Sequence, residues 1–240
     1  GVLVEQPHLA HTSRVLALNE ELCAEILRPK RPRDAFRGAA RIFRGLAGQA
    51  FGREGAATIL APGGSSPLGT LGWVSGGLEL AAQFADGAFP VPDEVFVAYG
   101  SGGTAVGLAL GLALAEVPCD VVAVRVATRL SGNARYASLL ARRTFALLSS
   151  RGRLGTMPRL RLVFEHGYSG PGYGSPTSEA EAAIASAVGS GVPLEPTYTG
   201  KALAAFLAAV RRDPEGRARM FLDTYSPIAK LGAKRGVERA

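Results

Sequence analysis

The sequence predicts an α/β fold in which helices cover both faces of a parallel sheet. Short apolar segments alternate with longer segments of helical periodicity, and this alternation is typical of parallel sheets. The apolar segments are continuous, as in Val121-Val122-Ala123-Val124, which is the pattern of strands buried on both faces. Of the 240 residues 47% are hydrophobic and 20% are charged, so the chain can bury a large core and is not a disordered chain.

The elements are expected in a regular order. Apolar or β-branched runs predict strands at residues 58–61, 94–99, 120–127, 160–165 and 219–224. Helical patterns between them predict helices at residues 34–51, 68–84, 104–115, 134–149, 178–189 and 201–211. Ser178 and Glu181 form a capping-box pattern that marks the start of the fifth of these helices. With no internal repeat or long linker, we expect one compact unit.

Residues 95–115 are the one segment that raises the possibility of a membrane span. These 21 residues carry no charge, and a spanning helix needs roughly 18 or more such residues. Gly100-Ser101-Gly102-Gly103-Thr104 interrupts the run in its middle, however, and favours a buried strand, a glycine loop and a core helix. The sequence therefore favours a soluble protein without a membrane partner.

Composition also excludes several kinds of site. Only Cys23 and Cys119 are present, so no disulfide framework is expected, and a reducing, cytoplasmic setting fits. His8, His11 and His166 have no H-E-x-x-H context, and we expect no metal site. The sequence also lacks the G-x-S-x-G nucleophile motif of hydrolases.

The net charge of +7 is concentrated in one segment. Residues 28–54 hold eight lysines or arginines and two acidic residues, and such a stripe can bind nucleic acid. Phe36, Phe43 and Phe51 are spaced by seven and eight residues, which places them on one helical face, as in a core-facing helix. A solvated arginine face on an amphipathic helix is the favoured interpretation, so nucleic acid is disfavoured as a partner.

The glycine loop after the second predicted strand is a candidate anion site. The loop leads into a helix that starts near Thr104, so backbone amides, the helix dipole and two hydroxyls could hold a phosphate. A glycine turn that only allows close packing is an equally good explanation. The loop matches G-x-G-x-x-G/A, but Asp120 begins the next strand instead of following it, so a dinucleotide-binding dehydrogenase is a distant alternative.

Two later loops place a tyrosine among glycines and prolines directly before a helix. They are Gly170-Pro171-Gly172-Tyr173-Gly174 and Pro196-Thr197-Tyr198-Thr199-Gly200-Lys201. Tyrosine can act as an acid or base or stack on a flat ring, and a neutral threonine hydroxyl can bond a ring nitrogen. For each loop taken by itself, a tyrosine that merely covers a helix end is the favoured explanation.

Taken together, these motifs resemble the pyridoxal-phosphate enzymes of the 1-aminocyclopropane-1-carboxylate deaminase and D-cysteine desulfhydrase family. The resemblance rests on the three loops above and on a fourth, earlier motif, Pro62-Gly63-Gly64-Ser65-Ser66-Pro67-Leu68-Gly69-Thr70-Leu71-Gly72. It implies the tryptophan synthase β-like fold, also called fold type II, pyridoxal 5'-phosphate as cofactor, a small amino acid as substrate and a possible homodimer. It also implies that residues 1–85 are the remainder of the small cofactor domain and residues 86–240 the large pyridoxal-phosphate-binding region.

The resemblance assigns roles to individual residues. It implies that Ser101, Gly102, Gly103 and Thr104 hold the cofactor phosphate. It further implies that the catalytic tyrosines on the substrate side of the pyridine ring are Tyr173 and Tyr198. Thr199 matches the position beside the pyridine nitrogen, where deaminases of the family carry Glu and desulfhydrase-like members carry Thr. The resemblance therefore implies a desulfhydrase-like or deaminase-like enzyme and leans away from opening of a cyclopropane ring.

One feature of the family is missing from this sequence. The only lysines are Lys30, Lys201, Lys230 and Lys234, and none lies in the context of the family's Schiff-base lysine. The chain also begins without Met, so we expect an N-terminally incomplete fold that is inactive by itself, because covalent catalysis needs that amine. The alternative is a non-catalytic phospho-ligand-binding protein whose basic helix meets an anionic partner.

Overall fold

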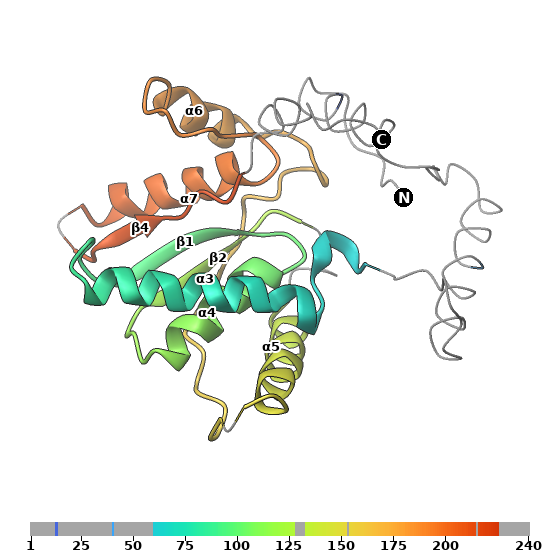
Figure 1. Ribbon diagram of the computed structural model, residues 1–240. Coiled ribbons are helices and arrows are strands. Elements are labelled where there is room, and N and C mark those ends of the chain that lie inside the picture. Colours follow the sequence, from blue (N-terminus) through green and yellow to red (C-terminus); the bar gives the residue numbers. More distant parts are fainter. Residues whose placement is uncertain are drawn as a thin grey trace, which may run out of the picture. The chain divides into compact units, whose positions relative to one another are not determined.

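The computed structural model describes residues 60–127, 133–152, 154–214 and 216–225, together with Ser13 and Ala40, which are both helical. The chain divides into two compact units, Ala61–Ser226 and a second unit made of Gly1–Leu60 and Pro227–Ala240. The fold given below is that of the first unit (Figure 1).

Four strands form one parallel sheet in the described part of the chain. They are β1 (Glu94–Tyr99), β2 (Asp120–Arg125), β3 (Leu162–Glu165) and β4 (Arg219–Phe221). Their order is β3-β2-β1-β4, and every neighbouring pair is parallel. The parallel sheet predicted from the sequence is thereby confirmed, with β1 and β2 at its centre.

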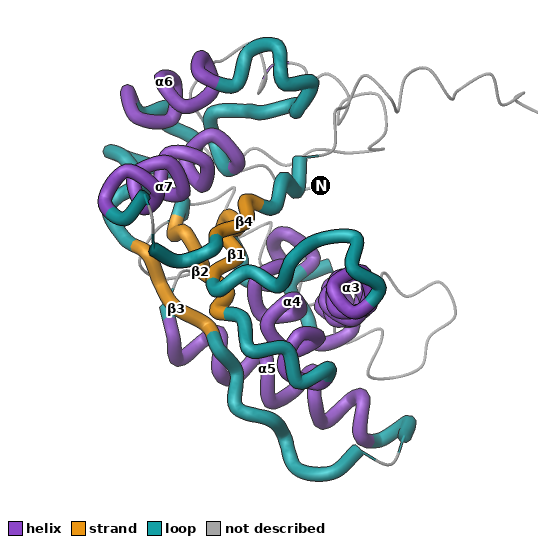
Figure 2. Tube along the Cα trace, turned by 90° about the vertical axis from the view of Figure 1, so that its left-hand side faces the viewer, coloured by secondary structure: helices purple, strands orange, loops and turns teal. Residues whose placement is uncertain are grey.

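Helices cover both faces of this sheet, as Figure 2 shows. The helical elements are η1 (Pro62–Gly64), α3 (Pro67–Ala85), α4 (Gly103–Leu114), α5 (Ala134–Ser149), α6 (Ser178–Ser186) and α7 (Thr199–Arg212). Helices α4 and α5 lie on one face with α3 packed against α4, and α7 lies on the other face with α6 against it. The helices on both faces were predicted and are confirmed.

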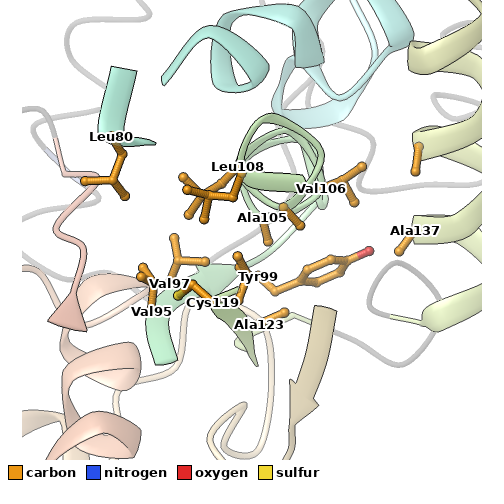
Figure 3. Close-up of a cluster of buried hydrophobic side chains, with 14 of the residues drawn as sticks. Leu80, Val95, Val97, Tyr99, Ala105, Val106, Leu108, Cys119, Ala123 and Ala137 are labelled. Atoms are coloured by element: carbon orange, nitrogen blue, oxygen red, sulfur yellow. The ribbon is translucent and has the colours of Figure 1, made fainter. Parts of the chain in front are cut away.

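The two faces of β1 and β2 bury different core clusters because successive strand side chains point to opposite sides. Val95, Val97 and Tyr99 join the cluster beneath α4 and α5. Phe96 and Val122 pack instead with small residues of α7. In Figure 3 the first cluster runs from Leu80 to Ala137, and the Tyr99 ring extends toward Ala137 of α5.

The close approach of α3 and α4 depends on glycine. A Cβ on Gly77 would lie 2.7 Å from the carbonyl oxygen of Leu108, and one on Gly107 would lie 2.7 Å from that of Thr70. Both distances are too short for a side chain, so the two backbones touch. This contact fixes the loop before α3 beside the N-terminus of α4, where the glycine loop lies.

Several predicted boundaries are corrected. Leu60 and Ala61 are not in a strand, because Pro62 follows and starts η1 with its fixed φ and missing amide. Strands β3 and β4 are shorter than predicted, because β3 pairs with β2 only over Leu162–Glu165 and β4 pairs with β1 only over Arg219–Phe221. Helix α6 is capped by Thr177, whose hydroxyl accepts a bond of 3.2 Å from the Ala180 amide, and not by Ser178.

The uncharged segment at residues 95–115 is confirmed as a strand, a glycine loop and a helix, here β1, Gly100–Gly102 and α4. Among the described residues no helix has the length and apolar character needed to cross a bilayer. The predicted basic helix at residues 34–51, with its charged segment, lies outside the described residues apart from Ala40.

Candidate functional site

The candidate site lies at the carboxyl edge of the sheet. Because all four strands are parallel, the loops after Tyr99, Arg125, Glu165 and Phe221 leave the sheet on the same side. Ligands of open α/β sheets bind at this edge. Asp120 lies at the opposite edge, because it begins β2, and it accepts a hydrogen bond of 2.7 Å from Arg161. A dinucleotide-binding dehydrogenase needs its acidic residue at the carboxyl end of the strand, near the glycine loop. The position of Asp120 therefore argues against that alternative.

The loop after β1 turns sharply into α4. Gly102 has φ +98°, a left-handed conformation that favours glycine, and α4 begins at Gly103. The amides of Ser101, Gly102, Thr104 and Ala105 make no hydrogen bond with any residue that the structure describes. These amides and the positive end of the α4 dipole form a site that fits a phosphate group.

We call the loop and the helix start at residues 100–105 the cradle, and Ser65 closes one side of it. Its hydroxyl accepts a hydrogen bond of 2.9 Å from the Gly103 amide and donates one of 2.7 Å to the Ser101 hydroxyl. Only 5% of Ser65 is exposed. The turn before α3 is thus tied directly to the cradle, which leaves the amides at Thr104 and Ala105 for a ligand.

Tyr99 supports the cradle from below. Its hydroxyl lies so close to Gly102 that a Cβ there would approach it to 2.6 Å. Burial, with a smaller contribution from Tyr136, raises the pKa of Tyr99 to about 12. Its hydroxyl oxygen has no hydrogen-bond partner within the described part of the chain. The glycines of the loop therefore serve close packing as well as exposing amides.

The two predicted tyrosines lie together. The hydroxyls of Tyr173 and Tyr198 are hydrogen-bonded, and their rings meet edge to face with centroids 6.2 Å apart. The Tyr198 ring also lies against the cradle, since a Cβ on Gly100 would be 2.9 Å from its Cε1 atom. Burial and the bond to Tyr173 raise the pKa of Tyr198 well above its usual range, so this phenol keeps its proton at neutral pH.

Thr199 follows Tyr198 at the start of α7 and is buried. Its hydroxyl accepts a hydrogen bond of 3.0 Å from the Glu195 amide. The hydroxyl hydrogen has only longer contacts, 3.4 Å to the Glu195 carbonyl and 3.5 Å to its carboxylate. This geometry suits a hydroxyl that donates to a further acceptor.

Sequence reasoning did not identify four residues that build this site: Ser65, Tyr99, Glu195 and Lys201 as a buried structural lysine. Ser65 belongs to the motif at residues 62–72, but the motif does not show that its hydroxyl bonds to the cradle, and Tyr99 meets the cradle only through tertiary packing. Glu195 had a detectable signal, because an acidic residue just before a helix favours its N-terminus. His166 is exposed and stacks on Phe164, with ring centroids 6.3 Å apart, and takes no part in the tyrosine pair.

Known proteins share this architecture. The family model described as "Pyridoxal-phosphate dependent enzyme" matches residues 13–222. A putative 1-aminocyclopropane-1-carboxylate deaminase of Pyrococcus abyssi (strain GE5 / Orsay) is 33% identical over 168 residues, which are 69% of this chain and 48% of that protein. A D-cysteine desulfhydrase of Yersinia pestis (strain Pestoides F) is 38% identical over 152 residues, which are 62% of this chain and 44% of that protein.

A solved structure agrees with these sequence matches. The crystal structure of an ACC deaminase homologue superposes with a TM-score of 0.63 and 26% identity, over 85% of this chain and 59% of that one. The chain spans about half the length of the curated relatives it matches. The predicted fold, the tryptophan synthase β-like fold type II, is confirmed. The chain belongs to the family of pyridoxal-phosphate dependent enzymes.

Proposed function

We propose that this chain carries the phosphate cradle and the substrate-side tyrosines of a pyridoxal-phosphate dependent lyase or deaminase that acts on a small amino acid. The observation that supports this most directly is the position of Tyr198, whose ring lies against Gly100 of the cradle and whose hydroxyl bonds to Tyr173. A pair of hydrogen-bonded phenols thus lies beside a group of amides suited to phosphate.

Each residue has a definite task in this proposal. The amides around Ser101–Thr104 hold the cofactor phosphate, aided by the Ser101 and Thr104 hydroxyls. The cofactor, when bound, supplies an electron sink for bond breaking at the α-carbon of an amino acid. Tyr198 would donate its hydroxyl proton on the substrate side, and Tyr173 would replace that proton with its own through the bond between the two hydroxyls, before solvent reprotonates Tyr173.

Thr199 bears on which reaction is supported. Its hydroxyl accepts a bond from the Glu195 amide, and its hydrogen, which makes only the longer contacts of 3.4 and 3.5 Å to Glu195, would turn to donate to a neutral ring nitrogen. A threonine cannot keep that nitrogen protonated as a carboxylate can. This favours a D-cysteine desulfhydrase-like reaction over opening of a cyclopropane ring.

We further propose that the 240-residue chain has no turnover by itself. Lys201 is the only lysine among the described residues; its side chain is fully buried and its amine donates a hydrogen bond of 2.9 Å to the Ser169 carbonyl oxygen. An amine held in this way is not free to bond the cofactor covalently.

The test is to incubate the chain with pyridoxal phosphate, reduce it with borohydride and map the modified peptides, with free lysine as competitor. We expect saturable binding of the cofactor, no lysine labelled above the level of exposed amines, and no ammonia released from D-cysteine. Stoichiometric, competition-resistant labelling of Lys201, or release of ammonia and 2-oxo acid at an enzyme-like rate, would contradict the proposed inactivity. Absence of cofactor binding would contradict the proposed site.

The alternative function is a non-catalytic phospho-ligand-binding protein with a basic helix for an anionic partner. The cradle supports it equally, because its amides recognise any phosphate. Binding of inorganic phosphate without preference for pyridoxal phosphate, together with RNA binding that falls steeply with salt, would favour this alternative. A homodimer and a cytoplasmic location remain part of the main proposal, and sedimentation of the purified chain tests the dimer.

A further inference from the structure

Two charged side chains are buried next to the tyrosine pair. Glu195 is 3% exposed and Lys201 is fully buried. Buried charges are costly unless bonds and opposite charges compensate them. Their partners therefore indicate what these two residues hold in place.

The Glu195 carboxylate binds the backbone at the start of α7. It accepts hydrogen bonds of 2.7 Å from the Thr197 amide, 2.7 Å from the Tyr198 amide and 2.9 Å from the Thr199 amide. Bonds to a charged acceptor are stronger than neutral ones. Tyr198 has φ −124° and ψ −69°, a conformation that is neither helical nor extended. The carboxylate thus holds Tyr198 in a backbone conformation that α7 does not impose.

Lys201 binds the loop that leads to Tyr173. It lies in the first turn of α7, and its amine donates a hydrogen bond of 2.9 Å to the carbonyl oxygen of Ser169. The next residue, Gly170, has φ +69° and leads through a tight turn to Tyr173. A single turn of α7 is therefore connected to both tyrosines.

The two charges also support each other. Burial lowers the pKa of Lys201, and the Glu195 carboxylate opposes this change. Glu195 thereby favours the ammonium form, which makes the stronger bond to the Ser169 carbonyl.

We propose that Glu195 and Lys201 are positioning residues that hold Tyr198 and Tyr173 against each other. Glu195 acts through the backbone of Tyr198, and Lys201 acts through Ser169 on the loop of Tyr173. This inference rests on the proposed function, in which both phenols face the substrate. It adds two residues that act on the tyrosines through backbone groups.

The test uses the full chain without cofactor, at neutral pH, labelled with ¹³C at the Cζ atoms of its six tyrosines. The Cζ chemical shift reports the hydrogen bonding of each phenol, and Tyr→Phe variants assign the two resonances. Tyr173→Phe should shift the Tyr198 resonance in the parent chain, because it removes the bonded hydroxyl. The same substitution is then made in Glu195→Gln, Lys201→Met and, as control, Leu112→Ala backgrounds.

Leu112→Ala is the control for a general loss of stability away from the tyrosine pair, because Leu112 belongs to α4 and is buried in the core cluster on the other face of the sheet. We expect the Tyr198 shift caused by Tyr173→Phe to persist with Leu112→Ala and to fall below half with Glu195→Gln and with Lys201→Met. An undiminished shift in both charge variants would overturn the proposal. If Glu195→Gln does not fold by circular dichroism, Lys201→Met decides alone. Because no cofactor is used, failure of cofactor binding leaves this result unaffected.

Discussion

Replacing Gly102 by alanine tests the geometry of the cradle most directly. The backbone at Gly102 has φ +98°, and the new Cβ would lie 2.6 Å from the Tyr99 hydroxyl oxygen and 2.9 Å from its Cζ atom. Tyr99 is fully buried and its ring packs edge to face on Phe164, with centroids 5.2 Å apart. The tyrosine therefore has little room to move away.

The magnitude follows from two separate costs. A left-handed conformation costs an alanine about 1–2 kcal/mol. Overpacking against a fixed ring costs about 1–3 kcal/mol more. Gly87 provides the matched control, because it has φ +74° and no atom within 4 Å of a Cβ placed there. Gly87→Ala should carry only the conformational cost.

The assay is urea denaturation of both variants followed by circular dichroism. We expect the free energy of unfolding to fall by about 2–5 kcal/mol for Gly102→Ala and by about 1–2 kcal/mol for Gly87→Ala. Under the proposed function, affinity for pyridoxal phosphate should fall at least tenfold only in the first variant. Equal losses of stability in the two variants would show that the contact between Tyr99 and the cradle is wrong.

Three further substitutions test neighbouring features. Tyr99→Phe removes a buried hydroxyl that has no partner among the described residues, and should leave stability unchanged or raise it by about 1 kcal/mol. The pKa of Tyr99 is raised from 10.0 to about 12 in the folded protein, so the stability that depends on its neutral phenol is present below pH 10 and is lost as the pH rises toward 12. In urea titrations, Tyr99→Phe should lose less stability over this alkaline range than the parent chain. Burial raises the pKa of the Cys119 thiol to about 12 and shields the thiol from reagents. In a Cys23→Ser chain, Cys119 should therefore react with a disulfide reagent at pH 8 at least about 100 times more slowly in the folded state than in guanidinium. Equal rates in the two states would contradict the burial of Cys119. Ser65→Ala leaves the buried Gly103 amide without its hydroxyl partner and should lower the free energy of unfolding by about 1–3 kcal/mol, and an unchanged urea midpoint would refute that bond's role.

Local patterns in the sequence were sufficient to predict the order of strands and helices in the described unit. The continuous apolar run before Gly100 and the glycines after it specify a buried strand, a turn and a helix start through short-range effects. The helix predicted at residues 134–149 is observed as α5 (Ala134–Ser149), because Asn133 caps its first turn, accepting a bond of 2.8 Å from the Tyr136 amide. Patterns of this kind depend only on neighbouring residues.

The tertiary structure decided which distant groups meet at the carboxyl edge. Sequence patterns marked Tyr173 and Tyr198 separately, and a turn residue was the favoured explanation of each by itself; only packing brings their hydroxyls together. Ser65 reaches Gly103 across 38 residues, a contact that no spacing rule describes. Composition and periodicity determine which elements form, whereas long-range contacts depend on how those elements pack, because they require groups from separate elements to fill the same space.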